Sequence, residues 1–172
     1  LRCFGDVGLG AQTIREQPRL VPSPQERDDP PVPALYAFRE AHGLPHHPRV
    51  IVYSLRGRLE RDYPLFNTPG VEVIIVGTAA AAAAFSEPAA SERTVRTATV
   101  SVIAEPVLEP AGLRRAHERL SAERGVRYLA CEGGERVLRA LSSTSIASRS
   151  PSTGRRTASA FSISSPSSAA AT

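Results

Sequence analysis

The stretch at residues 126–141, VRYLACEGGERVLRAL, constrains the fold of this chain most. Residues 126–131 form a short apolar run with β-favouring side chains, which is typical of a strand buried in a parallel sheet. Gly133 and Gly134 end that run, and residues 137–141 place apolar side chains on one face of a short helix. A strand that ends in glycines and opens a helix presents free backbone N–H groups at the carboxyl edge of a sheet. We therefore expect an anionic ligand to bind there.

Other segments predict further parallel strands and the helices between them. Runs rich in β-branched residues without polar alternation indicate strands buried on both faces, at residues 50–54, 71–76 and 98–104. A short helix is expected at 79–85, and a longer one from Pro110, a favourable first helical residue, to its C-cap at Gly125. Strands that alternate with helices predict an α/β fold, with a mainly parallel sheet flanked by helices.

The first part of the chain predicts one more strand and a long connection. Residues 6–14 combine a short apolar strand with a Gly-Ala-Gln-Thr turn, in which Thr13 either caps a helix or faces a ligand. Residues 18–33 are dense in proline and indicate an exposed loop. Residues 34–42 have apolar side chains at helical spacing and predict a short helix.

Small or hydroxylated residues follow four of the predicted strands. In an open parallel sheet, ligands bind outside the carboxyl ends of the strands. Those ends are expected at residues 8–13, Ser54, residues 77–78 and residues 132–134. Glu132 either faces the ligand or serves as a salt-bridge partner or cap of the following helix. We find no Ser-His-Asp arrangement and no close acidic pair in the sequence, so no catalytic side chain is assigned.

Composition argues against several other classes of protein. All 21 basic residues are arginine, which indicates compositional bias more than a designed basic patch. The segment 142–172 supplies +3 of the formal net charge of +4, so the body is nearly neutral and lacks the arginine clusters and aromatic platforms of a nucleic-acid binder. No apolar stretch is long enough to span a membrane, and a cytoplasmic location is expected.

Cysteine and histidine give no metal spacing. Cys3 and Cys131 are far apart in the sequence, and we expect buried free thiols in a reducing compartment. His42, His46 and His47 lack a carboxylate or cysteine companion at a ligating spacing, so a solvent-facing cluster is the preferred interpretation.

Several segments together resemble a known family. These are PRVIVYSLRGRLERDYPLF at 48–66, VEVIIVGTAA at 71–80, ERGVRYLACEGGERVLRAL at 123–141 and GLGAQTIREQPRL at 8–20. They resemble the reductase domain of riboflavin biosynthesis, the C-terminal domain of the bifunctional deaminase/reductase. The resemblance implies a dihydrofolate-reductase-like fold and NADPH-dependent reduction of 5-amino-6-(5-phosphoribosylamino)uracil, or a related pyrimidine, to its ribitylamino product.

The resemblance also implies a set of site residues. The positions that match cofactor contacts of the family are Thr13, Ser54, Gly133 and Gly134. Hydride chemistry belongs to the nicotinamide, so the protein has to orient the ring, hold the phosphates and exclude water. A homodimer is implied by the resemblance alone.

Two further positions correspond to substrate contacts. Glu132 matches an acidic residue that reaches the substrate. Gln17 stands where many members carry an acidic side chain, so this contact departs from the family pattern. Glu135 replaces the usual proline after the two glycines and places a carboxylate near the pyrophosphate site, where it is electrostatically unfavourable.

The pattern ends after residue 141. Residues 142–172 are serine-rich, contain no acidic residue and show almost no apolar periodicity. We therefore expect an incomplete reductase domain at 1–141 and a disordered tail at 142–172 that supplies no strand. The chain begins with Leu1 and contains no methionine, so truncation at both ends is expected. A change of reading frame is one hypothesis for the tail.

Two functional hypotheses remain open at this point. The first is an NADPH-dependent reductase of the riboflavin pathway or of a related pterin substrate. The second is a truncated, non-catalytic reductase-like fragment that keeps part of the cofactor site. Binding of NADPH by the purified chain distinguishes a working cofactor site from its absence.

Overall fold

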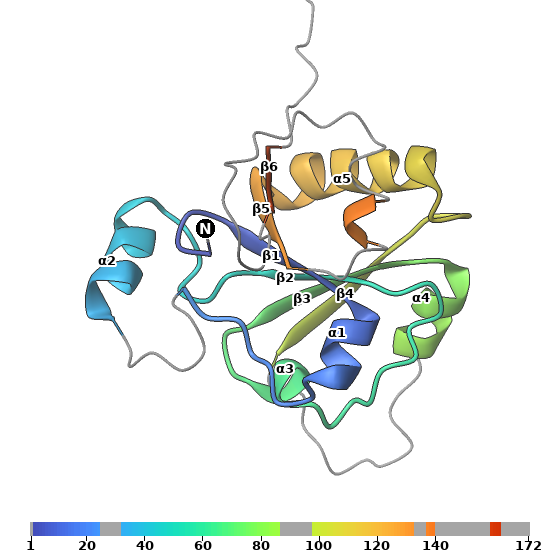
Figure 1. Ribbon diagram of the computed structural model, residues 1–172, viewed down its shortest axis with the longest axis horizontal. Coiled ribbons are helices and arrows are strands. Elements are labelled where there is room, and N and C mark those ends of the chain that lie inside the picture. Colours follow the sequence, from blue (N-terminus) through green and yellow to red (C-terminus); the bar gives the residue numbers. More distant parts are fainter. Residues whose placement is uncertain (1, 25–31, 87–97, 133–136, 140–158, 163–172) are drawn as a thin grey trace, which may run out of the picture.

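The computed structural model describes residues 2–24, 32–86, 98–132, 137–139 and 159–162. Within these residues the chain forms a six-stranded sheet in the order β4-β3-β2-β1-β5-β6 (Figure 1). The strands are β1 (Asp6–Gly10), β2 (Val50–Tyr53), β3 (Glu72–Gly77), β4 (Thr99–Ala104), β5 (Tyr128–Cys131) and β6 (Ser159–Ser162). The first five strands are mutually parallel, and β6 is antiparallel to β5.

Helices cover both faces of this sheet. They are α1 (Ala11–Glu16), α2 (Pro33–Ala41), α3 (Pro64–Asn67), α4 (Ala79–Ser86) and α5 (Pro110–Arg124). Figure 1 shows α1, α3 and α4 on one side of the sheet, α5 on the other, and α2 to the side of these layers. The predicted α/β class with a mainly parallel sheet flanked by helices is confirmed, which is the class expected of a dihydrofolate-reductase-like protein.

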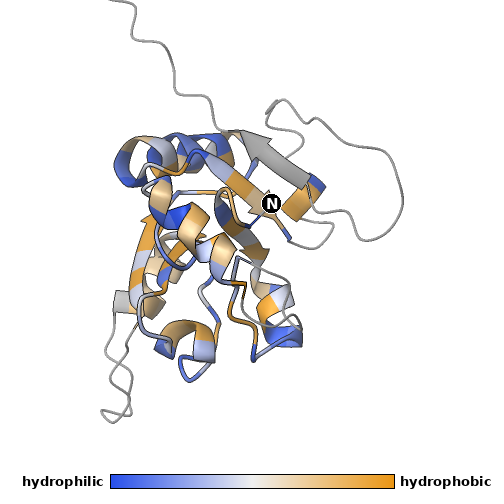
Figure 2. Cartoon of the chain, turned by 90° about the vertical axis from the view of Figure 1, so that its left-hand side faces the viewer, coloured by the Kyte–Doolittle hydropathy of each residue, from blue (hydrophilic) through white to orange (hydrophobic). Residues whose placement is uncertain are grey.

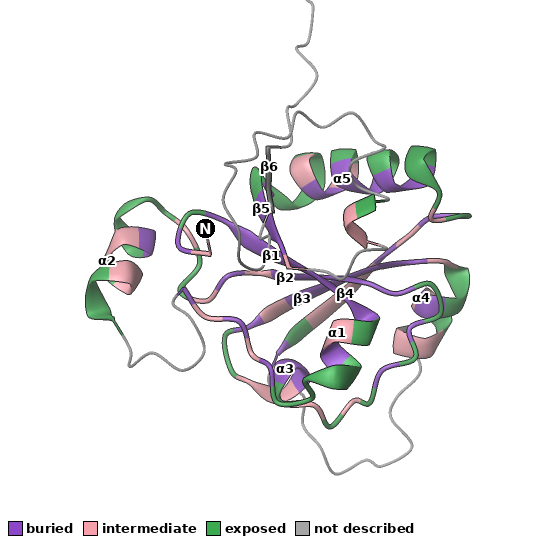
Figure 3. Cartoon of the chain, viewed as in Figure 1, coloured by how far each residue is buried: buried purple, intermediate pink, exposed green. Residues whose placement is uncertain are grey.

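The strand side chains explain this three-layer arrangement. Along β2, Val50 and Val52 enter the core under α1, α3 and α4, whereas Ile51 and Tyr53 enter the core under α5. All four residues are buried. Figure 3 likewise colours β1 as buried, and Figure 2 shows hydrophobic, orange stretches along strands of the sheet. A strand covered on both faces needs apolar residues at every position, and the run VIVY supplies them.

The order of the strands creates a switch point beside β1. From β1 the chain steps outward through β2, β3 and β4, and α5 then returns it to the other side of β1, where β5 pairs. Helix α1, which follows β1, therefore packs on one face of the sheet, whereas Val137 and Leu138, which come after β5 in the sequence, pack on the other face. In open α/β sheets this position is where the carboxyl edge opens into a crevice.

Helix α5 follows its sequence signals. Pro110 is its first residue, and Gly125 ends it in the left-handed conformation with a φ of 63°, as predicted. Leu113, Ala116 and Leu120 form its buried stripe and pack on β2, β3 and β5. The helix is therefore held by its apolar face and stopped by its C-terminal glycine.

The N-terminal segment is held by one buried arginine. The Arg39 side chain of α2 is fully buried and donates hydrogen bonds to the carbonyl oxygens of Arg2, Gly5 and Pro45 at 2.7–2.9 Å and of Cys3 at 3.2 Å. Burial lowers the pKa of Arg39 from its ordinary value. These hydrogen bonds of the Arg39 side chain join α2 to the N-terminal turn and to the loop after α2.

Three sequence expectations need correction. Thr13 lies inside α1 and does not cap it, because the N-cap is Gly10. Leu20, inside the predicted exposed loop, is buried in the core because the chain turns back onto the sheet after α1. The predicted tail does supply a strand: residues 159–162 form β6, which finds unpaired backbone groups along the edge of β5. The other residues of 142–172 lie outside the described residues.

Among the described residues, no helix is both long enough and apolar enough to cross a membrane.

Candidate functional site

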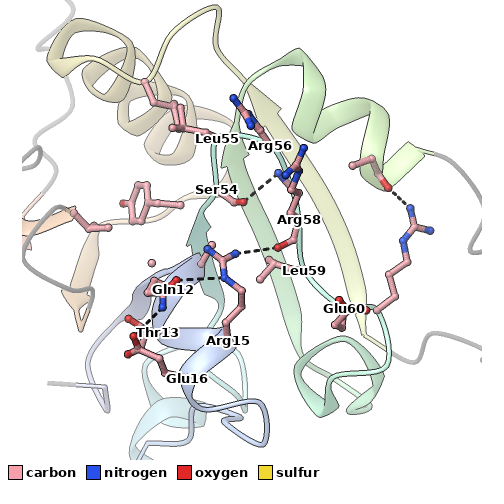
Figure 4. Close-up of a pocket in the computed structure, with 18 of the residues that line it drawn as sticks. Gln12, Thr13, Arg15, Glu16, Ser54, Leu55, Arg56, Arg58, Leu59 and Glu60 are labelled. Atoms are coloured by element: carbon pink, nitrogen blue, oxygen red, sulfur yellow. Dashed lines mark hydrogen bonds between the residues drawn. The ribbon is translucent and has the colours of Figure 1, made fainter.

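A cleft with a volume of about 1380 Å³ opens at the carboxyl ends of β1 and β2 (Figure 4). Its walls come from the end of β1, helix α1, the loop that follows β2, the end of α4 and the start of α5. This is the edge at which the sequence predicted a ligand. Small-molecule sites in proteins have volumes of about 300–1,000 Å³, so the cleft is large enough for a ligand of that class.

The structure brings two of the predicted cofactor residues together in this cleft. Thr13 lines it from α1, and Ser54 lines it from the residue after β2. The buried Ser54 hydroxyl oxygen accepts a hydrogen bond from the Gly57 amide at 3.1 Å, as drawn in Figure 4. Ser54 therefore fixes the loop after β2, while its own hydroxyl proton stays available for a ligand.

Gly57 makes the turn of this loop possible. Its φ of 63° lies in the left-handed region, and a Cβ placed on it would lie 3.0 Å from the Cα of Ala81. A glycine is needed for both reasons. The loop at residues 55–61 consequently packs tightly against α4 and keeps its side chains at the mouth of the cleft.

Arginines dominate the charge of one side of the cleft. The lining includes four arginines, Arg15, Arg56, Arg58 and Arg61, against two glutamates, Glu16 and Glu60. Arg56 and Arg58 are exposed, and Figure 4 shows them on the loop after Ser54. This side of the cleft is electropositive and suits a ligand with several phosphate groups.

Two of these arginines also tie the walls together. Arg15 donates to the Arg58 carbonyl oxygen at 3.0 Å and so joins α1 to the loop. Arg61 donates to the Ala84 carbonyl oxygen and lies 5.5 Å from the centre of the Phe85 ring. None of the four arginines was predicted as a site residue, because the arginine content was attributed to composition. Three of them lie in LRGRLER at 55–61, which directly follows a strand end and is a usable signal.

The other side of the cleft is apolar. Leu108, Leu113 and Val137 line it together with the aromatic ring of Tyr53. Gly10 lies at its floor, where an added Cβ would come within 3.2 Å of a Val137 methyl group. The cleft thus has a charged side beneath α1 and the loop after β2, and an apolar side beneath α5.

A buried tyrosine and histidine form the deepest polar contact at the apolar side. The Tyr53 hydroxyl oxygen lies 2.8 Å from His117 Nε2, and both residues are buried. Burial lowers the pKa of His117 to about 4 and raises the pKa of Tyr53 well above its ordinary value. Both side chains are therefore neutral at pH 7. Sequence reasoning did not single out either residue, because a lone histidine on a helix gives no pattern.

The predicted substrate residues lie elsewhere. Glu132 makes a two-point ion pair with the Arg2 guanidinium and does not line the cleft. Its backbone amide donates to the Gly8 carbonyl oxygen at 2.8 Å, so it remains next to the end of β1. Gln17 is the exposed C-cap of α1 and also lies off the cleft. Gly133 and Gly134 fall outside the described residues, so the predicted pyrophosphate turn stays a prediction.

The histidine cluster is aromatic in character. The rings of Tyr36 and His46 stack with centroids 4.5 Å apart, and His46 meets His47 edge-on at 4.9 Å. Within the part of the chain that the structure describes, no group of three or more histidine, cysteine, aspartate or glutamate side chains is placed to hold a metal ion. Cys3 and Cys131 are buried and form no disulfide.

Comparison with known proteins gives only distant structural similarity. No protein-family model matches the chain, and no curated protein matches it. Among solved structures, the chain is similar to the crystal structure of a pyrimidine reductase-like protein from Corynebacterium diphtheriae. The sequence identity is 12% and the TM-score is 0.36, with 94% of this chain and 77% of that chain covered. A similarity this distant assigns neither a family nor an activity.

Proposed function

We propose that this chain is an NADPH-dependent reductase of the riboflavin pathway that acts on 5-amino-6-(5-phosphoribosylamino)uracil or a related pyrimidine. The observation that carries the proposal is the two-sided cleft at the carboxyl edge of the sheet, in which Thr13 and Ser54 meet an arginine-rich wall. The sequence resemblance to that reductase domain supplies the choice of cofactor and substrate.

The residues of the cleft fit the cofactor in charge and in polarity. Arg56 and Arg58 are exposed at the mouth and can pair with phosphate oxygens, while the hydroxyls of Thr13 and Ser54 can hydrogen-bond to the ribose or phosphate groups. The apolar side excludes water from a flat ring. When bound, the nicotinamide supplies the hydride. The chain's own task is to orient the two reactants and keep their reacting atoms dry.

The proposal also covers the substrate, the oligomeric state and the cellular location. The substrate carries its own phosphate, and the electropositive wall that includes Arg15 suits it. Glu132 and Gln17 stay proposed substrate contacts on the resemblance alone, although neither lines the cleft. Gly133 and Gly134 are proposed for the cofactor site in the same way. A homodimer and a cytoplasmic location belong to the same proposal, and a pterin in place of the pyrimidine is its closest variant.

Replacement of single arginines tests the charged side. Arg58→Gln removes a guanidinium from the mouth of the cleft, and a lost charged hydrogen bond is worth about 1.5–3 kcal/mol, or roughly 10- to 100-fold in affinity. We expect NADPH binding to weaken by that factor in calorimetric titration. The matched control is Arg114→Gln, which removes an exposed arginine of α5 that is not among the cleft residues. Equal affinity for NADPH in wild type and Arg58→Gln would show that this arginine binds no phosphate.

One observation favours a second candidate, a chain that binds NADPH without turning over substrate. Glu132, the predicted substrate contact, is engaged by Arg2 and lies off the cleft. Measurement of NADPH oxidation in the presence of the ribosylaminopyrimidine phosphate separates the two candidates. Saturable binding with turnover supports the reductase, whereas saturable binding without turnover supports the non-catalytic chain.

A further inference from the structure

The contact between Tyr53 and His117 leaves one nitrogen without a partner. His117 Nδ1 is buried and has no hydrogen-bond partner among the described residues. The Tyr53 hydroxyl likewise contacts only His117 Nε2 within the described part of the chain. These two facts limit where the two exchangeable protons of the pair can be.

A neutral histidine carries its proton on one of its two nitrogens. If the proton is on Nδ1, the Tyr53 hydroxyl donates to Nε2, and a buried N–H group stays without an acceptor. If the proton is on Nε2, that N–H donates to the Tyr53 oxygen, and Nδ1 keeps only an unused lone pair. Each arrangement leaves one donor without an acceptor among the described residues, Nδ1–H in the first and the Tyr53 O–H in the second. Because Tyr53 lines the cleft and His117 does not, only the Tyr53 O–H can find an acceptor in the cleft, and the second arrangement is favoured.

The second arrangement frees the hydroxyl proton of Tyr53. Tyr53 is the last residue of β2 and lines the apolar side of the cleft. His117 lies on α5 and contacts the Tyr53 hydroxyl. It is one helical turn after Leu113, which lines the apolar side of the cleft. A hydroxyl that accepts from His117 has its own proton left for the cleft, where water or a ligand oxygen can accept it.

We propose that Tyr53 is the proton donor to the substrate in this cleft and that His117 is the positioning residue that directs its hydroxyl proton there. This inference rests on the proposed reductase function. In the proposed reduction, hydride adds to the sugar carbon that carries the amino nitrogen, the bond from this carbon to the ring oxygen breaks, and the electron pair left on that oxygen must take a proton. The O–H bond of Tyr53 breaks, a new O–H bond forms on the substrate, and the Tyr53 oxygen recovers a proton from water.

His117 also assists the step after the proton has left. Its Nε2–H group can donate to the Tyr53 phenolate as the negative charge develops, in a site that excludes most water. A substrate alkoxide is a stronger base than a phenolate, so proton transfer from tyrosine to it is downhill. His117 touches no substrate in this scheme.

Kinetics of variants test the donor. Tyr53→Phe keeps the ring and removes the proton, and general acid catalysis contributes about 10²- to 10⁴-fold. We expect kcat for NADPH oxidation with the ribosylaminopyrimidine phosphate to fall by that factor, with KM for NADPH unchanged. Unchanged kcat in a folded Tyr53→Phe variant overturns the donor role.

A pair of His117 variants separates positioning from simple packing. The amide nitrogen of Gln can take the place of Nε2, so His117→Gln should keep kcat within about fivefold of wild type. His117→Leu fills the site without a donor and should lose about 10-fold or more. Equal kcat for the two variants overturns the positioning role, because packing alone would explain both.

Nuclear magnetic resonance of the histidine rings gives a test that needs no turnover. In ¹⁵N-labelled full chain at pH 7, the signals absent from His117→Gln identify His117, and we expect a neutral ring protonated on Nε2. A ring protonated on Nδ1 overturns the inference, whatever the kinetics show. If wild type neither binds nor oxidises NADPH while the ring is protonated on Nε2, the reductase proposal fails, and the presented hydroxyl proton of Tyr53 is supported for another ligand.

Discussion

Replacement of His117 by glutamine should make the chain less sensitive to acid. Burial lowers the pKa of His117 to about 4, against 6.5 for the unperturbed side chain. Between these two values the unfolded chain binds a proton that the folded chain does not, so the free energy of unfolding decreases as the pH is lowered. Neutral His117 therefore contributes stability that is fully present above pH 6.5 and is lost as the pH falls toward 4. A difference of about 2.5 pKa units corresponds to about 3 kcal/mol.

Urea denaturation at several values between pH 7.5 and pH 4 measures this effect. Other groups titrate over the same range, so the informative quantity is the difference between wild type and His117→Gln. We expect wild type to lose about 3 kcal/mol more than the variant over that range. The control His42→Gln removes an exposed histidine that stacks on Phe38, and it should follow wild type. Parallel curves for wild type and His117→Gln would refute the buried, neutral state of His117.

Two further substitutions test the packing and the charges of the sheet. Asp6→Asn breaks the ion pair with Arg49, whose Nη2 lies 2.8 Å from Oδ2 with both side chains largely buried, and should cost about 3 kcal/mol in urea denaturation. Glu123→Gln removes an exposed ion pair and should cost much less; equal losses would contradict the role of burial. Gly77→Ala would place a Cβ 2.4 Å from that of Ala81 and should cost about 1–3 kcal/mol, whereas an unchanged denaturation midpoint would show that α4 shifts freely.

The sequence predicted those helices and strands that are specified by residues within the element itself. The apolar runs of β2 and β3 and the Pro110 and Gly125 signals of α5 each specify an element without information from distant residues. A prediction of mainly parallel pairing followed from their alternation with helices, and it is confirmed. The same reasoning placed the ligand edge at the strand ends, where the cleft lies.

Features that depend on distant partners were not predictable in this way. Arg39 appears as an ordinary helical cation in the sequence, and only the convergence of four carbonyl oxygens from separate segments explains its complete burial. The buried hydrogen bond of His117 is made to Tyr53, 64 positions away in the chain. Leu20 is buried because the loop after α1 crosses the core, which proline content cannot reveal. Strand β6 has few local signals and is defined by its pairing with β5.

The residues of the candidate site also divide into those with a local sequence signal and those whose position depends on distant partners. Thr13 and Ser54 were predicted from strand order, and both line one cleft, with Thr13 inside a helix. The position of Glu132 depends on Arg2, whose side chain reaches it across 130 positions of sequence. The arginines of the loop after β2 had a local signal, but an arginine-rich composition obscured it.

Calorimetric titration of the full chain with NADPH tests the central claim most directly. The account predicts saturable one-to-one binding that weakens with salt, because phosphate groups meet the arginine wall of the cleft. The affinity should fall in Arg58→Gln and stay unchanged in Arg114→Gln. Absence of any heat of binding at millimolar NADPH, with the chain folded by circular dichroism, would contradict the claim that this cleft is a dinucleotide site.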